Sequence, residues 1–400
     1  MGIRPFFMLT VVLLFLPALL WGGEKTVIGH RGAPGYLLEN NIPSLVLAVA
    51  QGADAIQQDV VMTKDNRLVV YRDLFLDTGT NVKELFPDRE RQDGHAYVID
   101  FTLDEIQLLF LTEPGESARF PMDTTNPGLR IPSLEEMLAV VRGLEKTLEK
   151  PINLFLEIKK PWFHRQEGRD ISQSVLQTLA RFHYGGENSL LSLQSFDHEE
   201  LKRIHDQLLP AMSLHLNLIQ MIDHNNGQET MIDVGGSKRG YQYDWMFSKF
   251  GLKALSLCVN GIGLDQSMLV DEMGVDLQSS FLENGRTLGL KIYVYTLAAD
   301  ALPPYAESFD TLLEHFLVQL GVDGVYTDHC DRVVQYLRNR SVFQDTSTPP
   351  TTEQTPEGEG SPLINPLEGP LMPITLSPAV SAGPIQIHPL PEEAHGHSDQ

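Results

Sequence analysis

The sequence predicts an α/β fold, specifically a TIM-type (β/α)8 barrel, and two observations support this. Short apolar runs alternate with amphipathic stretches from Lys25 to about Arg338, which is typical of parallel strands joined by helices. The first apolar run, "TVIGH", is not followed by a glycine-rich dinucleotide turn, so an open doubly wound sheet is disfavoured. A closed barrel should carry its chemistry on the rim where the strands end, which we call the mouth.

The individual elements follow from local pattern. The expected strands are "TVIGH", "AIQQDVVMT", "RLVVYRD", "INLFLEIK", "SLLSLQSF", "SLHLNLIQM", "GIGL", "LKIYVYTL" and "VDGVYTD". The turn residues "KDN" join the second of these runs to the third. Helices are expected over "NIPSLVLAVAQGA", 133–148, 170–183, 197–208, 277–289 and 307–320.

Three segments depart from the alternation and set the domain organisation. Residues 1–23 hold Arg4, an apolar run and two glycines, which is the layout of a secretory signal peptide. We therefore expect an exported protein, periplasmic or secreted, with no membrane span once the leader is removed. An uncleaved membrane anchor is the alternative, although the run is a few residues short of a comfortable span.

The barrel is expected over 24–340, with an insertion at about 78–130 and a tail over 341–400. A long insertion between a strand and its helix usually covers the substrate; the alternative is that it only adds structure at the rim of the barrel. The tail is rich in Pro, Ser, Thr and Glu without helical period, and we expect it to be disordered because it offers little apolar surface to offset the entropy of ordering.

Composition excludes some classes of function. A net charge of −23 argues against nucleic acid as a partner, because phosphate binding requires clustered Lys and Arg. The two cysteines, Cys258 and Cys330, are too few for a disulfide framework and lack the CxxC spacing of a zinc site. Whether they pair, and the oligomeric state, remain open at this stage.

Polar side chains stand at the expected ends of several strands and in one following loop. They are His30, Arg31, Glu39, Gln57, Asp59, Arg72, Asp73, Glu157 and Lys159. Residues two apart on a strand share a face. Gln57 and Asp59 should therefore point into one mouth, and so should Glu157 and Lys159. Acidic and amide oxygens beside Arg and Lys suit a hard divalent cation bound next to an anionic substrate oxygen.

Several separated motifs carry a resemblance to a known family. The stretches "GHRGAPGYLLENN", "QGADAIQQDVVMTKDNRLVV", "EIKKPWFHRQEGRDI", "LQSFDHEELKRI", "YDWMF" and "GVDGVYTD" closely resemble the glycerophosphodiester phosphodiesterase family, especially its larger exported bacterial members. The resemblance runs from about residue 26 to 338. It implies a calcium-dependent TIM-barrel hydrolase that cleaves small glycerophosphodiesters into glycerol 3-phosphate and an alcohol.

The resemblance also implies roles for individual residues. His30 matches the first catalytic histidine, which helps the neighbouring glycerol hydroxyl attack phosphorus. Asp59 and Glu157 match metal ligands, with Gln57 at the third ligand position. For substrate binding, Arg31 accompanies His30 in the HRG motif, and Lys159 matches a position that favours the phosphate. Glu39 matches an acidic residue of the same mouth.

Two positions depart from the family pattern. Gln57 replaces an expected metal-binding Glu, so an oxygen ligand remains but one negative charge is lost, and metal affinity should fall. Arg72 replaces the expected second catalytic His; arginine can bind a phosphate oxygen but cannot exchange a proton near neutral pH. Loss of one general acid typically costs ~10² to 10⁴ in rate.

These departures leave alternatives open. The chain is either a slow hydrolase or a degenerate barrel that binds a phosphodiester without turning it over. A further alternative is that Asp59 and Glu157 pair with Arg31 and Lys159 as buried salt bridges without metal. His329, just past the last strand, is a substitute proton donor to be tested against an ordinary loop histidine, and His164 is a second candidate.

Overall fold

The computed structural model describes residues 25–113, 128–225 and 227–346, with side chains described as far as Arg340. The expected leader and nearly all of the expected tail lie outside these residues. The last helix continues to Thr346 and so passes the boundary at 340 that composition indicated. Among the described helices, none combines the length and apolar character needed to cross a membrane.

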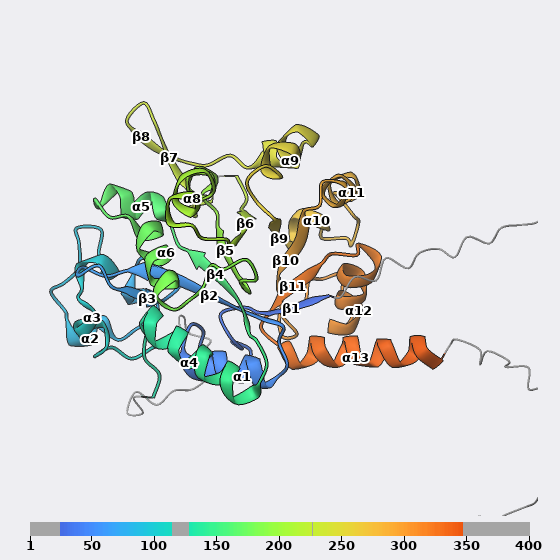
Figure 1. The fold of residues 1–400 in the computed structure, drawn as a ribbon, viewed down its shortest axis with the longest axis horizontal. Helices are drawn as coiled ribbons and strands as arrows, with labels where there is room; N and C mark the ends of the chain where they lie inside the picture. Colours follow the sequence, from blue (N-terminus) through green and yellow to red (C-terminus); the bar gives the residue numbers. More distant parts are fainter. Residues whose placement is uncertain (1–24, 114–127, 226, 347–400) are drawn as a thin grey trace, which may run out of the picture. The chain divides into compact units, whose positions relative to one another are not determined.

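Within the described residues, eight parallel strands close into a barrel (Figure 1). These are β1 (Thr26–Gly29), β2 (Ala55–Met62), β4 (Asn153–Ile158), β5 (Leu191–Ser195), β6 (Asn217–Ile222), β9 (Gly261–Asp265), β10 (Lys291–Leu297) and β11 (Gly324–Thr327). The hydrogen-bonded order is β1-β11-β10-β9-β6-β5-β4-β2, and pairing of β1 with β2 completes the ring. The predicted fold is confirmed.

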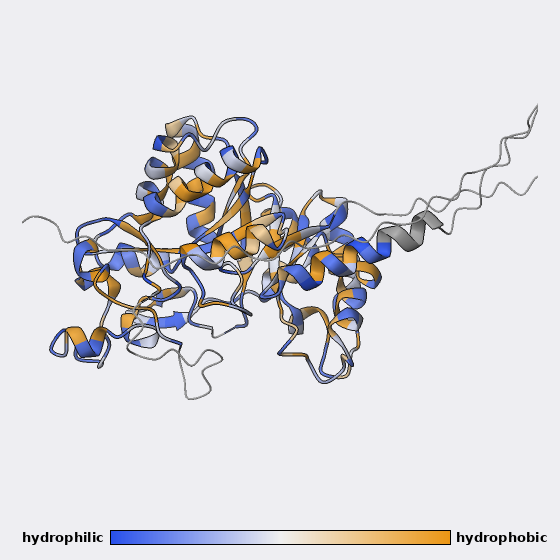
Figure 2. Cartoon of the chain, turned by 90° about the horizontal axis from the view of Figure 1, so that it is seen from below, coloured by the Kyte–Doolittle hydropathy of each residue, from blue (hydrophilic) through white to orange (hydrophobic). Residues whose placement is uncertain are grey.

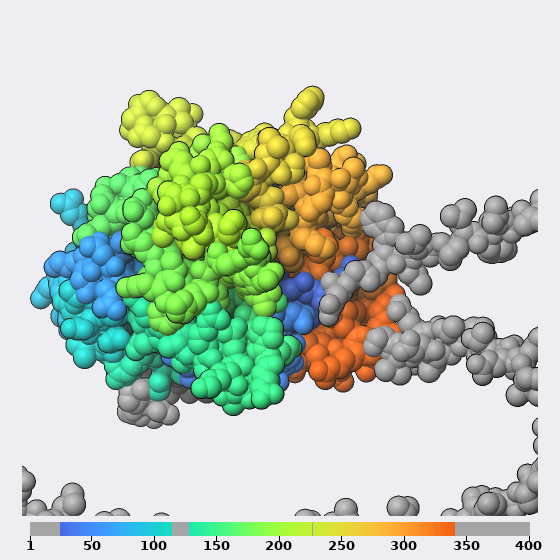
Figure 3. All heavy atoms as spheres, viewed as in Figure 1, coloured from blue at the N-terminus to red at the C-terminus, as the bar shows by residue number. Residues whose placement is uncertain are grey.

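Three short strands lie outside the ring. β3 (Leu68–Val70) pairs antiparallel with the end of β2, so the "RLVVYRD" run forms a hairpin with its predecessor and is not a barrel stave. β7 (Met231–Val234) and β8 (Ser237–Gly240) form a separate hairpin that stands out from the surface (Figure 3).

Helices fill the connections between the strands. The α-helices are α1 (Ile42–Ala50), α2 (Val82–Leu85), α3 (Leu103–Ile106), α4 (Leu134–Leu148), α5 (Pro161–Gln166), α6 (Ile171–Arg181), α7 (His198–Arg203), α8 (Leu209–Met212), α9 (Lys249–Leu255), α10 (Gln266–Leu269), α11 (Ser279–Thr287), α12 (Phe309–Leu313) and α13 (Cys330–Thr346). The shorter turns are η1 (Leu76–Thr78), η2 (Val98–Asp100), η3 (Ile204–Leu208), η4 (Asp244–Phe247) and η5 (Glu314–Gln319), of which η3 and η5 are π-helical and continue α7 and α12.

Local sequence explains where the principal helices begin. Asn41 caps α1 by accepting a hydrogen bond from the Ser44 N–H, and Pro43 occupies the first turn, where its missing N–H has no cost. Ser133 and Glu136 form a reciprocal capping box at α4. Figure 2 shows hydrophobic residues alternating with hydrophilic ones along the helices, as expected for helices that cover a barrel on one side only.

The predicted insertion lies between β3 and α4, and it packs with residues of β2, β3 and the loop before α1 into a hydrophobic cluster separate from the barrel core. This second cluster consists of Leu38, Val61, Val69, Tyr71, Leu76, Val82, Ala96, Val98, Phe101, Leu103, Ile106, Leu109, Leu111 and Ile131. A small contact cluster joins the insertion to α5, with Ile99 and Tyr97 packed around Phe163. Because α5 follows the carboxyl end of β4, the insertion lies beside the mouth.

The barrel interior is closed below the mouth by large side chains. Ile28, Phe155, Ile219 and Met221 form this inner cluster with Tyr326, and the tyrosines of β10 pack against it. The barrel is thus a packed core, not a pore. Cys258 and Cys330 are both buried free thiols, which settles the question of their pairing.

Candidate active site

Strand register brings two carboxylates together at the mouth. In the β2–β4 pairing, Asp59 lies directly beside Glu157, and both residues are near the carboxyl ends of their strands. Asp59 is 0% exposed and Glu157 is 5% exposed. Two acids far apart in the chain are thus buried neighbours, as the sequence predicted.

Asp59 is surrounded by donors from the protein itself. Its Oδ1 accepts from Gln57 Nε2 at 2.9 Å. Its Oδ2 accepts from Asn40 Nδ2 at 2.9 Å and lies 2.7 Å from Arg31 Nε. Burial alone would raise the pKa of Asp59, but the positive charge of Arg31 and other donors outweighs burial and lowers the pKa. This carboxylate is ionised and fully paired.

Glu157 is paired in the same way. Its Oε1 accepts from Lys159 Nζ at 2.7 Å, and its Oε2 accepts from Gln194 Nε2 at 2.9 Å. Lys159 also donates to Glu229 Oε2 at 2.9 Å. Burial opposes the charge of Lys159, yet the two glutamates raise its pKa above the ordinary value. The lysine therefore stays cationic.

Glu39 links two arginines at the entrance. Its Oε2 accepts from Arg31 Nη1 at 2.9 Å, and its Oε1 lies 3.2 Å from Arg72 Nε. The Arg72 side chain is 34% exposed, whereas that of Arg31 is 18% exposed. Arg72 is therefore anchored by Glu39 while part of its side chain still faces solvent.

His30 directly follows β1, the strand that pairs with β2, and so lies at the same mouth. Its Nδ1 is 2.9 Å from Oδ1 of Asp328, which follows the last barrel strand, and the His30 side chain is 20% exposed. Burial by itself would raise the pKa of Asp328, but the hydrogen bond with His30 holds that pKa below its usual range. With Asp328 as acceptor, Nδ1 carries the proton and the second ring nitrogen is free.

The loop after β1 adopts an unusual backbone to place these groups. Arg31 and Asn40 have positive φ values of 56° and 55°, which are uncommon for residues with a side chain. Turned in this way, the Arg31 N–H donates to Gln57 Oε1 at 2.9 Å. Gly32, at φ 104°, lies so close to α1 that an added Cβ would be 2.5 Å from Ser44 Oγ. The glycine of the HRG motif is required for this close approach.

The donor set does not fit a calcium ion. Calcium takes six to eight oxygen ligands, several of them carboxylates. Every oxygen of Asp59 and Glu157 already accepts from a protein donor, and Gln57 presents its NH2 group, not its oxygen, to Asp59. Over the described residues no group of three His, Cys, Asp or Glu is arranged to hold a metal.

The structure brings together most of the site residues that the sequence singled out, and it adds others. Asp73 is the exception, because among the described residues it accepts hydrogen bonds only within its own loop, from the Leu74 N–H and the Thr78 hydroxyl. Asn40, Gln194, Glu229 and Asp328 complete the network of hydrogen bonds. Gln194 lies beside Glu157 in the β4–β5 pairing and donates to it. The sequence prediction missed Asp328, for which the only signal is the "DH" of "VYTDHC".

Neither candidate for a substitute donor is available as one. The His329 ring is buried, its Nδ1 accepts from the Ala299 N–H at 3.2 Å, and its Nε2 lies 3.9 Å from Asp300 Oδ1. His164 accepts from the Met62 N–H through Nε2 and donates from Nδ1 to the Lys160 carbonyl. Burial lowers the pKa of His164 to about 4. Both rings have structural roles.

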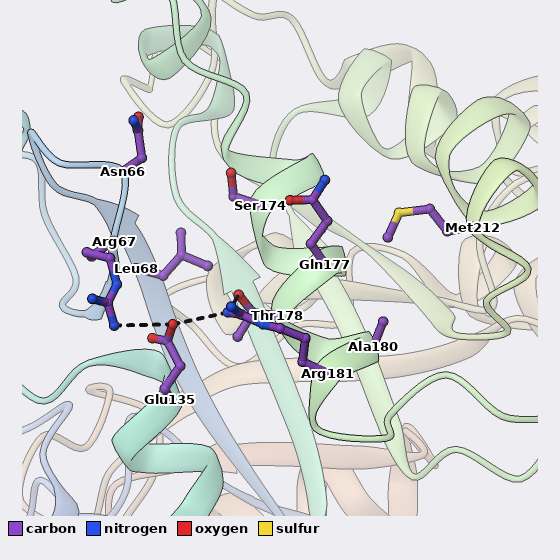
Figure 4. Close-up of a pocket in the computed structure, with 10 residues that line it drawn as sticks. All are labelled: Asn66, Arg67, Leu68, Glu135, Ser174, Gln177, Thr178, Ala180, Arg181 and Met212. Carbon is purple, nitrogen blue, oxygen red and sulfur yellow. Dashed lines mark hydrogen bonds and ion pairs between the residues drawn. The ribbon is translucent and has the colours of Figure 1, made fainter.

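A groove of about 850 Å³ lies elsewhere, on the outer helical layer between the β2–β3 turn and α6 (Figure 4). Glu135 bridges Arg67 and Arg181 there, and the remaining lining residues are mostly uncharged. This groove lacks the histidine and buried acids of the mouth, so we place the candidate site at the mouth.

Comparison with known proteins shows the family. The family model described as "Glycerophosphoryl diester phosphodiesterase family" matches residues 30–332. Proteins named glycerophosphodiester phosphodiesterase from Treponema pallidum and Haemophilus influenzae are each 38% identical to the chain. The alignments cover 80% and 79% of this chain and 96% and 90% of those proteins.

Solved structures with lower identity share the fold. A phosphodiesterase from Oleispira antarctica, in complex with its product sn-glycerol 3-phosphate, has a TM-score of 0.53 at 18% identity, covering 78% of this chain and 96% of its own. A glycerophosphodiester phosphodiesterase from Parabacteroides distasonis has a TM-score of 0.51 at 22% identity, covering 80% and 100%. With the family model matching residues 30–332, the chain belongs to the glycerophosphoryl diester phosphodiesterase family.

Proposed function

We propose that the chain binds glycerophosphodiesters at the mouth and hydrolyses them to glycerol 3-phosphate and an alcohol, with low turnover. The observation that carries the proposal is the His30–Asp328 pair at a mouth that also holds the cationic side chains of Arg31, Arg72 and Lys159. A phosphodiester is an anion that needs both a positive clamp and a group that moves a proton. Family membership supplies the substrate class.

His30 is the proton-transfer group of this scheme. Asp328 fixes its tautomer and orientation, which leaves the free ring nitrogen as the base for the glycerol hydroxyl that attacks phosphorus. Arg31, Arg72 and Lys159 bind the phosphate oxygens and stabilise the charge that develops on them. No histidine is placed to protonate the leaving alcohol at position 72, and turnover is therefore low.

A calcium requirement is implied by the family resemblance, but the donor set of the mouth gives it no support. Chelation is therefore included as a condition of the test. Export likewise remains a proposal that rests on the leader over residues 1–23.

The test is a coupled assay for glycerol 3-phosphate released from glycerophosphocholine, in calcium and in EDTA. Slow release that His30→Ala abolishes supports the enzyme. The matched control is His205→Ala, because His205 is an exposed histidine on the outer layer and its removal should leave the rate unchanged. Release that persists in His30→Ala would contradict the assignment.

A second candidate, a binding protein without turnover, is favoured by one specific observation. Arg72 is positioned by its ion pair with Glu39. Its guanidinium can bind an anion, but it cannot donate a proton near neutral pH. Binding of the intact diester, with no release above that of the His30→Ala variant, would support this reading.

A further inference from the structure

We infer that Gln57 and Arg72 together replace a divalent cation, so that this mouth binds the phosphate of its ligand through Arg31, Arg72 and Lys159 without any metal. The inference rests on the proposed use of the mouth for a phosphodiester, and it concerns how the anion is held. It does not depend on whether turnover follows.

The first argument is the polarity of the group at position 57. Gln57 Oε1 accepts from the Arg31 N–H, so its Nε2 is directed at Asp59 Oδ1, 2.9 Å away. An amide NH2 is a donor, and it occupies the side of the carboxylate from which a cation would be held. A glutamate at this position would bring a second negative charge to Asp59, which only a cation could offset.

The second argument is that both acids of the mouth are already neutralised by the chain. Asp59 is paired with Arg31, and Glu157 is paired with Lys159, and all four residues are largely buried. Removing a charged partner from such a pair leaves an uncompensated buried charge, which is strongly destabilising. A cation entering this space would have to displace Arg31 or Lys159 from its carboxylate.

The third argument is the charge balance of the two departures. Glutamine in place of glutamate removes one negative charge, and arginine in place of a neutral histidine adds one positive charge. Together they change the net charge of the mouth by two, which is the charge of a divalent cation.

The two positions are also physically linked. Gln57 contacts the Arg31 backbone, Arg31 contacts Glu39, and Glu39 holds Arg72. Because they belong to one network, reverting one position without the other should leave the site unbalanced, and their effects should not add.

The experiment measures ligand binding and thermal unfolding of the full chain in EDTA and in calcium, with sn-glycerol 3-phosphate and inorganic phosphate as probes. The unmodified chain should bind sn-glycerol 3-phosphate with the same Kd in both buffers, within about twofold, and calcium should leave its Tm unchanged. In Gln57→Glu/Arg72→His, calcium at ~100 times its Kd should raise the Tm by roughly 5 °C. Each single variant should gain less than half of that shift.

Gln177→Glu/Arg181→His is the matched control. It makes the same two chemical changes at exposed positions on α6 in the groove of Figure 4, and it should gain no calcium-dependent shift. If the double variant at the mouth does not fold, the two-buffer comparison on the unmodified chain still decides the question.

The inference is overturned if calcium raises the Tm of the unmodified chain through a saturable site that Asp59→Asn removes, or if sn-glycerol 3-phosphate binds only in calcium. Its failure is distinguishable from failure of the proposed function. Binding in EDTA without hydrolysis rejects turnover alone, whereas hydrolysis that EDTA abolishes rejects only metal-free binding.

Discussion

The residue at position 72 determines whether the mouth contains a second group that can transfer a proton. Arg72→His supplies a general acid but removes a cation, so we expect the single change to raise kcat by no more than about tenfold. Gln57→Glu/Arg72→His in calcium should raise it by ~10² or more, the usual contribution of a positioned acid. Steady-state release of glycerol 3-phosphate measures both.

The control for this prediction is Arg67→His, an exposed arginine on the β2–β3 turn, which should leave kcat unchanged. If the single and double variants gain equally, Gln57 has no part in the effect.

His164 gives a pH prediction for stability. Burial lowers its folded-state pKa to about 4, from the ordinary value of 6.5. Between pH 6.5 and 4, the His164 ring is protonated in the unfolded chain but stays neutral in the folded chain. The free energy of unfolding therefore falls as the pH is lowered from 7 toward 4. The loss should approach about 3 kcal/mol. Urea unfolding at pH 7, 6, 5 and 4 measures it.

His164→Gln should flatten this pH dependence, because glutamine can keep a hydrogen bond but does not titrate. A slope between pH 6.5 and 4 that is the same in the variant would show that other groups cause it.

At the scale of elements, the loop between β1 and α1 is the part that shapes the mouth. Gly32→Ala should destabilise the fold by about 3 kcal/mol, because an added Cβ meets the side chain and backbone of Ser44 and the φ of 104° is strained for alanine. Thermal or urea unfolding measures the change. Phosphate binding should weaken with it, because Arg31 is the preceding residue.

Gly94→Ala separates the two causes. Gly94 also has a positive φ, of 81°, but nothing lies within 4 Å of the added Cβ, so only the strain of about 1 kcal/mol remains. Equal losses in the two variants would mean that contact with α1 is not what requires glycine in the HRG motif.

At the scale of the whole molecule, the barrel core and the mouth are connected. The Tyr326 hydroxyl, inside the barrel, donates to Gln194 Oε1 at 2.7 Å, and Gln194 donates to Glu157. Tyr326→Phe should cost about 1–3 kcal/mol, since it leaves a buried amide oxygen without a donor. Chemical denaturation of the purified chain measures this cost.

Tyr36→Phe is the control, because the Tyr36 hydroxyl donates to Asp331 at the surface, and the change should cost less than about 0.5 kcal/mol. A loss for Tyr326→Phe no larger than for Tyr36→Phe would show that the core does not support the site.

The sequence by itself determined the barrel and part of its mouth. Alternating apolar and amphipathic segments require strands and helices of those lengths, and two-residue spacing on a strand fixes which side chains share a face. The places of His30, Asp59 and Glu157 at the ends of predicted strands, together with the family resemblance, predicted that they share one rim. Set against that resemblance, the residues at positions 57 and 72 also indicated that a charge and a proton donor were missing.

Only the tertiary structure decided how these groups use one another. A side chain's partner depends on register between strands, on the positive φ at Arg31 and on loops from distant parts of the chain, and none of these is encoded in local pattern. Asp328 and Glu229 entered the site in this way, as did the turn of Gln57 toward Asp59. Hydrogen bonds form only at donor–acceptor distances of about 3 Å. Whether a carboxylate of the mouth binds a metal or pairs with a cationic side chain is therefore decided by the three-dimensional positions of its neighbours.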